Sequence, residues 1–217
     1  MIHFDNITAN YSSNLGIKDF SLRIEKGEMI FLIGSSGAGK STILKCLYGD
    51  IQIQKGVITL EGLNISKLSE RQIQKLRRKI GVIFQDYRLI EHRTVFDNIA
   101  LPLRINKNSN KIVQQRTKEI LQEIGIPHLS ERFPSELSSG EQQCVSICRA
   151  LVKKPLMILA DEPTGNLDPQ TSIEILKILD RISKQGITVL MSTHNHALIE
   201  DTNKTIVYLK DGARILK

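Results

Sequence analysis

Short apolar runs along the chain alternate with segments in which hydrophobic residues recur every three or four positions. The apolar runs lie at residues 29–33, 80–84, 156–160 and 187–191, and each suits a strand buried on both faces. Helical spacing follows the first run as far as Gly49, and it returns from Ile112 to Ile124, where Gly125 ends the helix. This alternation predicts an α/β fold with a parallel central sheet.

Strict alternation marks a second kind of segment. Ile2 and Phe4 alternate with polar residues, as do Phe20, Leu22 and Ile24, which predicts antiparallel strands before residue 28. Residues 56–63 and 205–217 each predict a further hairpin, because a turn-forming pair ending in glycine lies within each of them.

The middle of the chain, from residue 87 to about residue 150, has a helical pattern throughout. Val95, Ile99 and Leu103 share one face of its first helix, which we expect Pro102 to interrupt. The 217 residues therefore predict a single domain, with residues 1–86 and 151–217 forming the core and an antiparallel β-subdomain. Residues 87–150 would form an inserted α-helical subdomain.

The loop after the first apolar run carries the most specific chemical pattern. Residues 34–42 read GSSGAGKST, which fits the phosphate-binding pattern G-x-x-x-x-G-K-[ST]. Glycines let successive backbone N–H groups face a polyphosphate, and the following helix N-terminus adds positive partial charge. We expect a nucleoside triphosphate to bind at Gly34, Ser35, Ser36, Gly37, Ala38, Gly39, Lys40, Ser41 and Thr42. Lys40 would reach the β- and γ-phosphates, and the Ser41 hydroxyl would complete a Mg²⁺ site.

Polar side chains follow the other apolar runs. Asp161 and Glu162 come after residues 156–160, and two adjacent carboxylates there are costly without a nearby cation. We expect Asp161 to hold Mg²⁺ and Glu162 to orient and deprotonate the attacking water. Gln85 and His194 end two further runs, where each taken alone is also consistent with a structural role. Their place beside the other polar strand ends favours a ligand site at this edge of the sheet.

Two more loops lead into predicted helices. Residues 137–143 read LSSGEQQ, in which Ser138 is a natural N-cap and the helix N-terminus suits an anion. Asp168 would cap the helix that begins at Pro169. Cys144 and Cys148 lie four apart on one helix face, as metal ligands or as small buried thiols.

Charge and composition limit the binding partners and the cellular location that this chain can have. The net charge of +7 is compatible with nucleic acid, an anionic membrane surface or phosphate ligands as partners. Its tightest cluster, in residues 71–79, is expected to be a solvated helix face. Because no apolar run approaches the ~20 residues of a membrane span and no segment has the pattern of a signal peptide, we expect membrane association only through a partner. Three cysteines form no disulfide framework, as suits a reducing cytoplasm.

These segments, in this order, resemble the ATP-binding cassette (ABC) ATPases over essentially the whole chain. Residues 34–42 resemble the Walker A loop, residues 156–162 Walker B and residues 137–143 the signature sequence. Gln85 resembles the Q-loop glutamine, Asp168 the D-loop aspartate and His194 the switch histidine. Tyr11 is a candidate A-loop aromatic, which would stack on the base or pack at the surface. The resemblance implies a P-loop NTPase fold of ABC-ATPase type, with a parallel RecA-like core, an antiparallel β-subdomain and an inserted α-helical subdomain.

The resemblance also implies an activity, hydrolysis of ATP with Mg²⁺. It implies catalytic roles for Glu162, His194 and Gln85, and a metal site at Ser41, Gln85 and Asp161. A homodimer would place Ser138, Ser139, Gly140 and Glu141 of one chain against the ATP of the other. Ser139, Cys144 and Asn195 depart from the family pattern.

Within the family, residues 160–168 resemble the branch that contains the lipoprotein-releasing, macrolide-export and cell-division ATPases. Residues 76–86 and 93–100 are most similar to the FtsE group of cell-division ATPases. That similarity implies a peripheral protein on the cytoplasmic face of the inner membrane. An FtsX-like integral membrane partner would dock near residues 86–103, where Tyr87, Arg88, His92, Arg93 and Phe96 are expected to be exposed. No nucleic acid is expected.

Two alternatives remain open from the sequence. One is the ATPase of a lipoprotein-release or macrolide-type export transporter, from the same branch of the family. The other is a soluble DNA-associated ABC ATPase. Such proteins carry coiled-coil or zinc insertions, whereas the stretch between Lys40 and Ser138 has no heptad run and no Cys-x-x-Cys.

Overall fold

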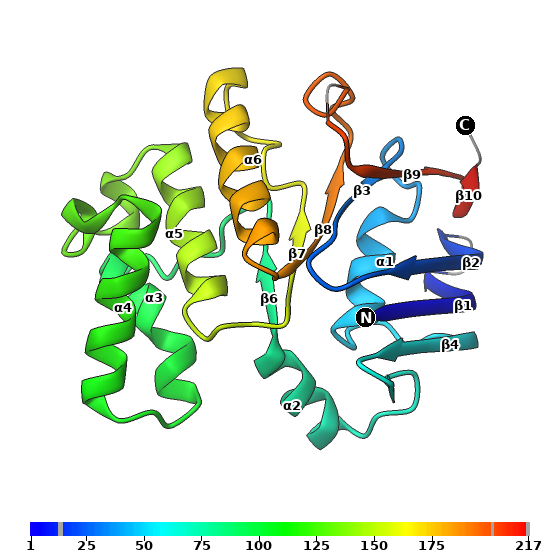
Figure 1. Cartoon of the computed structure of the whole chain (residues 1–217), viewed down its shortest axis with the longest axis horizontal. Helices are drawn as coiled ribbons and strands as arrows, with labels where there is room; N and C mark the ends of the chain where they lie inside the picture. The colour runs from blue at the N-terminus through cyan, green and yellow to red at the C-terminus, as the bar shows by residue number, and fades with distance from the viewer. Residues whose placement is uncertain (13–14, 201, 216–217) are drawn as a thin grey trace.

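The computed structural model describes residues 1–12, 15–200 and 202–215 (Figure 1). A six-stranded sheet in the order β10-β9-β3-β8-β7-β6 forms its centre. The four consecutive pairs from β9 to β6 are parallel, and only β10 runs antiparallel to its neighbour β9. The strands are β3 (Met29–Ile33), β6 (Ile80–Ile83), β7 (Met157–Asp161), β8 (Thr188–Thr193), β9 (Thr205–Lys210) and β10 (Ala213–Ile215). The predicted parallel core is confirmed.

Both faces of this sheet are covered at its central strands, where every residue of β3 and of β8 is buried, which explains the apolar runs there. Alternate residues of β3 enter two different clusters of the core. Phe31 packs with residues of the helices between residues 95 and 151 and with α6 (Pro169–Lys184). Ile30 and Leu32 pack with α1 (Lys40–Leu47) and with the antiparallel strands near the N-terminus. Helix α1 thereby starts at the carboxyl end of a central strand.

The antiparallel strands form a second sheet in the order β2-β1-β4-β5. Its strands are β1 (Ile2–Ser12), β2 (Leu15–Ile24), β4 (Lys55–Leu60) and β5 (Leu63–Asn64), as the alternating segments predicted. The turn at Glu61 and Gly62 has positive φ at both residues, 51° and 76°. Helix α2 (Glu70–Lys79), which begins after Ser69, leads back to the central sheet. Tyr11 lies in β1, but its side chain is outside the described residues.

The helical segment lies on the opposite side of the molecule from β1 and β2 (Figure 1). It consists of α3 (Val95–Ile105), α4 (Asn110–Ile124), two 3₁₀ turns (Pro127–Leu129 and Pro134–Glu136) and α5 (Ser139–Leu151). The expected break at Pro102 was wrong, because α3 continues through it. Ile99 and Leu103 are 0% and 5% exposed, so their packing offsets the roughly 3 kcal/mol that an interior proline costs.

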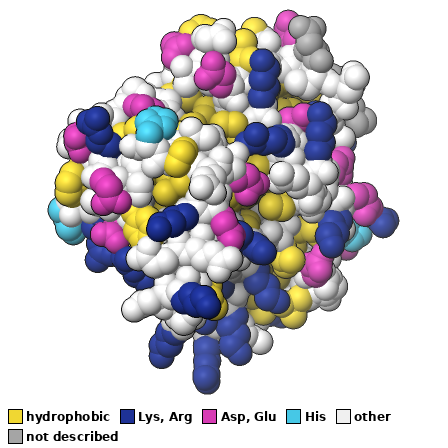
Figure 2. All heavy atoms as spheres, turned by 60° about the vertical axis from the view of Figure 1, so that its left-hand side comes forward, with side chains coloured by type: hydrophobic (Ala, Val, Ile, Leu, Met, Phe, Trp, Pro, Cys, Tyr) yellow, Lys and Arg dark blue, Asp and Glu magenta, His cyan; other side chains and the backbone are white. Residues whose placement is uncertain are grey.

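The surface carries its positive charge unevenly. Lys and Arg side chains gather at the lower edge of the face in Figure 2, the edge that α2 occupies in Figure 1. In α2 only Leu76 is buried, while Arg71, Lys75, Arg78 and Lys79 are exposed, as expected of a solvated basic face. Across the described residues, we find no helix with the length and apolar character that a bilayer span requires.

Candidate nucleotide-binding site

The loop between β3 and α1 forms the wall of a cavity of about 340 Å³, a size typical of small-ligand sites. Residues 36–42 line it, together with Gly16, Lys45 and Glu162. Gly37 and Gly39 have φ of 81° and 97°, in the region that favours glycine. A Cβ on Gly39 would lie 2.7 Å from a methyl carbon of Ile17, so the close approach of β2 also requires glycine there.

Lys40, the first residue of α1, is 5% exposed and turns back over its own loop. Its Nζ donates to the carbonyl oxygens of Gly34 at 2.8 Å and Ser35 at 3.1 Å. The same Nζ lies 3.3 Å from Oε1 of Glu162. The ammonium group is therefore held at the edge of the cavity, beside the carboxylate of Glu162, the candidate general base.

Three neighbouring elements bring their polar ends together at Asp161. The Ser41 hydroxyl of α1 donates to Asp161 Oδ1 at 3.0 Å. The Ser192 hydroxyl of β8 donates to the same oxygen at 2.7 Å. Adjacent hydroxyl and carboxylate oxygens are the hard donors that Mg²⁺ prefers, so Ser41 and Asp161 fit the predicted metal site.

Glu162 directly follows β7 in a left-handed conformation, with φ of 47°. Its N–H donates to the hydroxyl of Ser192 at 3.0 Å and to the Ser192 carbonyl at 3.2 Å. Its Oε2 lies 2.5 Å from Nδ1 of His194. Glu162 is 19% exposed and His194 59% exposed, so the pair faces the open side of the site. One carboxylate thus contacts both Lys40 and His194.

Gln85 is placed differently from the other predicted residues. Its Nε2 lies 3.5 Å from Oδ1 of Asn166, and its backbone carbonyl accepts a hydrogen bond from Asn166 Nδ2 at 3.1 Å. A Cβ on Gly165 would meet the Gln85 amide at 2.8 Å. The side chain therefore lies on the loop of residues 163–168, while Ser41 and Asp161 contact one another.

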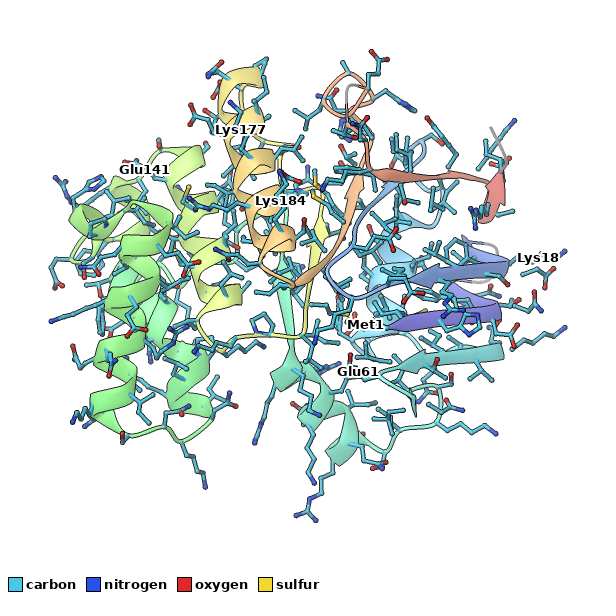
Figure 3. All side chains as sticks on the ribbon, viewed as in Figure 1. Met1, Lys18, Glu61, Glu141, Lys177 and Lys184 are labelled. Atoms are coloured by element: carbon cyan, nitrogen blue, oxygen red, sulfur yellow. The ribbon has the colours of Figure 1, made fainter. Side chains whose placement is uncertain are left out.

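The signature segment begins α5 in the helical segment. The Ser138 hydroxyl accepts a hydrogen bond from the Glu141 N–H at 3.3 Å, and Glu141 Oε2 accepts from the Ser138 N–H at 2.8 Å. This backbone bond is the main cause that lowers the pKa of Glu141. Ser138 and Ser139 are exposed, and Glu141 lies far from Lys18 of β2 (Figure 3). Among the described residues, no hydrogen bond joins residues 138–140 to residues 34–42.

The remaining predicted residues have clear structural positions. Asp168 caps α6, where its carboxylate accepts from the Thr171 N–H at 3.0 Å. Cys148 is buried, and Cys144 is half-buried with its pKa raised to about 11, mainly by burial. In the part of the chain that is described, no group of three or more His, Cys, Asp or Glu side chains could hold a metal ion.

Two residues of this region were not identified from the sequence. Ser192 lies at the end of β8, just after an apolar run, as Asp161 does at the end of β7. This position at a strand end was the sequence signal that could have identified Ser192 as a site residue. Gln143 is 0% exposed and donates from Nε2 to the Pro163 carbonyl at 2.5 Å. No local pattern indicates this contact, because its partner is a backbone atom of a distant loop.

Residues 17–165 match the ABC transporter family. The cell division ATP-binding protein FtsE of Mycobacterium tuberculosis is 42% identical over 98% of this chain and 93% of its own. FtsE of Escherichia coli K12 is also 42% identical, over 98% of this chain and 96% of its own.

Solved structures agree with the sequence relatives. A dimeric ATP-binding cassette, MJ0796, in a post-hydrolysis state with ADP and Pi has a TM-score of 0.87 and 32% identity. The alignment covers 100% of this chain and 97% of that one. The cassette cbiO1 of Clostridium perfringens has a TM-score of 0.90 at 30% identity, covering 99% of this chain and 86% of that one. The chain therefore belongs to the ABC transporter family of ATP-binding cassettes.

Proposed function

We propose that this chain is the ATP-binding and ATP-hydrolysing subunit of an FtsEX-like complex in bacterial cell division. It would couple ATP-driven closure of a homodimer to a membrane partner. The relatives that support the cell-division assignment carry it in their names and match nearly the whole chain. The observation that carries the enzymatic assignment is the contact of Glu162 with both Lys40 and His194 beside the glycine-loop cavity.

Binding would begin with the phosphates of ATP in this cavity. The backbone N–H groups of residues 36–42 and the N-terminus of α1 favour negative charge. The Lys40 ammonium would exchange its contacts with carbonyl oxygens and Glu162 for phosphate oxygens. Ser41 and Asp161 would hold Mg²⁺, and a bound ion would supply positive charge beside the phosphates. Gln85 would join this metal site only after leaving Asn166, because its amide lies against that residue.

Hydrolysis would depend on Glu162 and His194. Once Lys40 binds phosphate, Oε1 of Glu162 no longer contacts the ammonium group and can orient a water and accept its proton. His194 would contact the γ-phosphate and hold Glu162 through the Nδ1 contact. Positioning and charge stabilisation supply most of the catalysis in such reactions, so these contacts define the proposed active site.

The signature segment would complete the site in the second chain of the homodimer. Ser138 and Ser139 are exposed at the N-terminus of α5, which suits binding of a phosphate anion from outside the chain. Gly140 and Glu141 would lie at the same interface. A related cassette has been solved as a dimer with ADP and Pi, which supports this arrangement. Asp168, at the start of α6, would also face the dimer partner.

The FtsX-like partner would dock near residues 86–103, at the cytoplasmic face of the membrane. Arg88 and His92 are exposed, as expected for such a surface. The expectation was wrong for Arg93, which is half-buried, for Phe96, which is half-buried against the core, and for Tyr87, whose hydroxyl is buried. Arg149 donates to the carbonyls of Tyr87 and Arg88, both at 2.5 Å, so this surface is linked to α5. Identifying the membrane protein that co-purifies with the chain tests this assignment.

The hydrolytic role is tested by comparing the wild-type chain with Glu162→Gln. We expect the variant to bind ATP with an affinity within a few-fold of wild type. Its turnover should fall by about 10²-fold or more, the loss typical of a general base. Binding is measured with a fluorescent ATP analogue and turnover by phosphate release. Retention of rapid turnover would exclude Glu162 as the base, and absence of ATP binding by the wild-type chain would exclude the proposed function.

A further inference from the structure

Gln143 is a buried amide that joins the signature helix to the loop following Glu162. It is 0% exposed, and its Nε2 donates at 2.5 Å to the carbonyl of Pro163, the residue directly after Glu162. Its Oε1 is buried and has no hydrogen-bond partner. Buried polar groups are nearly always satisfied in folded proteins, so a half-satisfied glutamine at a core position suggests a role beyond packing.

The same side of α5 reaches the far end of this loop. Gly140 precedes Gln143 by three residues, which places both on one helix face. A Cβ on Gly140 would lie 2.6 Å from a methyl carbon of Thr171, whose N–H is bonded to the Asp168 carboxylate. Helix α5 therefore contacts the loop of residues 163–168 at its start through Gln143 and just beyond its end through Gly140.

The loop has space in which to shift. It borders a cavity of about 130 Å³, whose lining includes Glu162, Thr164 and His194. Protein interiors are otherwise close-packed and transmit displacements between contacting groups. A small movement of α5 can therefore move Pro163, and with it the adjoining Glu162, without first displacing other side chains from that space.

We propose that Gln143 is a positioning residue that links the signature helix to Glu162 within one chain. Engagement of Ser138 and Ser139 by the nucleotide of the opposite subunit displaces α5, and the bond from Gln143 to Pro163 carries this displacement to Glu162. Each half of the dimer then adjusts its own carboxylate when its signature helix is occupied. This inference rests on the proposed ATPase function and dimer.

The test is Gln143→Met, which keeps the length of the side chain but has no amide. The substitution removes the unpartnered Oε1, which favours stability, and leaves the Pro163 carbonyl unpartnered, which lowers it. Because these two effects oppose each other, we expect a melting temperature close to that of the wild type. Turnover should fall about 10- to 100-fold, with KM for ATP within twofold of wild type, because positioning rather than binding is lost. Ser146→Ala is the matched control. Ser146 is also 0% exposed on α5 with an unpartnered hydroxyl, and we expect wild-type turnover from its variant.

A double-mutant cycle separates positioning from a general effect on the fold. If Gln143 acts through Glu162, Gln143→Met should slow the residual rate of Glu162→Gln by less than twofold. The proposal is overturned if Gln143→Met retains wild-type turnover or changes only KM. It is equally overturned if Gln143→Met lowers the turnover of Glu162→Gln by the same factor as it lowers the turnover of the wild-type chain. It is also overturned if the loss of turnover only follows a loss of folded protein. In all of these outcomes the wild-type chain hydrolyses ATP, whereas an inactive wild type would instead contradict the proposed function.

Discussion

One hydroxyl group orients both acidic residues of the site. Ser192 is 0% exposed, donates to Asp161 Oδ1 at 2.7 Å and accepts from the Glu162 N–H at 3.0 Å. A serine hydroxyl has one donor and two acceptor positions, so it can make both bonds at once. The candidate metal ligand and the candidate base are therefore held relative to each other by β8, rather than by their own strand alone.

Ser192→Ala should consequently weaken the metal site and the active site together. We expect turnover about tenfold lower, and a higher Mg²⁺ concentration for half-maximal rate, as for the loss of a group that orients a metal ligand. The free energy of unfolding should fall by about 1–3 kcal/mol, because buried partners lose a hydrogen bond. Phosphate release during a Mg²⁺ titration measures the first two effects, and urea unfolding the third.

Ser183→Ala provides the control for this substitution. Ser183 is 3% exposed and donates to the Asp180 carbonyl in α6, away from the carboxylates. Its loss should affect stability and leave the Mg²⁺ requirement unchanged. Equal Mg²⁺ requirements in the two variants would show that Ser192 has no role in orienting Asp161.

At the scale of elements, the start of α5 depends on reciprocal bonds between Ser138 and Glu141. The Glu141 carboxylate accepts from the Ser138 N–H and hydroxyl, both at 2.8 Å, and the Ser138 hydroxyl accepts from the Glu141 N–H. This arrangement satisfies orphan donors and places a negative charge in the first turn of the helix. The helix end proposed to bind the phosphate of the dimer partner is thereby formed in advance.

Glu141→Gln should destabilise the chain in a pH-dependent manner. The pKa of Glu141 is lowered, chiefly by the Ser138 N–H, so the carboxylate contributes stability above the ordinary glutamate pKa. That contribution is lost as pH falls through the lowered native pKa. We expect the variant to be about 0.3–1 kcal/mol less stable at pH 7 and equal to wild type once Glu141 is protonated.

Urea unfolding of both proteins at neutral pH and at successively lower pH measures this difference. Glu123→Gln is the control, because Glu123 is an exposed carboxylate in the last turn of α4. A stability difference between Glu141→Gln and wild type that stays constant at every pH would contradict the charge-based account.

Local patterns predicted most elements correctly, because their causes lie within a few residues. The apolar runs became central strands, and the caps at Ser138 and Asp168 start their helices as expected. Pro102 was misjudged because the burial of Ile99 and Leu103 in the core outweighs the local tendency of proline to interrupt a helix. The Gln85–Asn166 contact and the Gln143–Pro163 bond join residues 81 and 20 positions apart, so no window of sequence reveals them.

At the scale of the whole molecule, the two halves of the proposed site lie apart within one chain. The glycine loop, Lys40 and Glu162 lie at the carboxyl edge of the central sheet, whereas Ser138 begins a helix in the separate helical segment. Because the signature end is exposed, a second copy of the chain can supply it to the first. ATP would then act as a shared ligand that stabilises the closed dimer by contacting both subunits.

Light scattering on Glu162→Gln saturated with Mg·ATP tests this central claim most directly. The account predicts a particle of twice the mass of one 24.5 kDa chain with ATP, and a single chain when ADP replaces ATP. Slow hydrolysis in this variant keeps the γ-phosphate in place, so the closed state should accumulate. A variant that binds Mg·ATP but remains monomeric, both alone and with its co-purified membrane partner, would contradict the account.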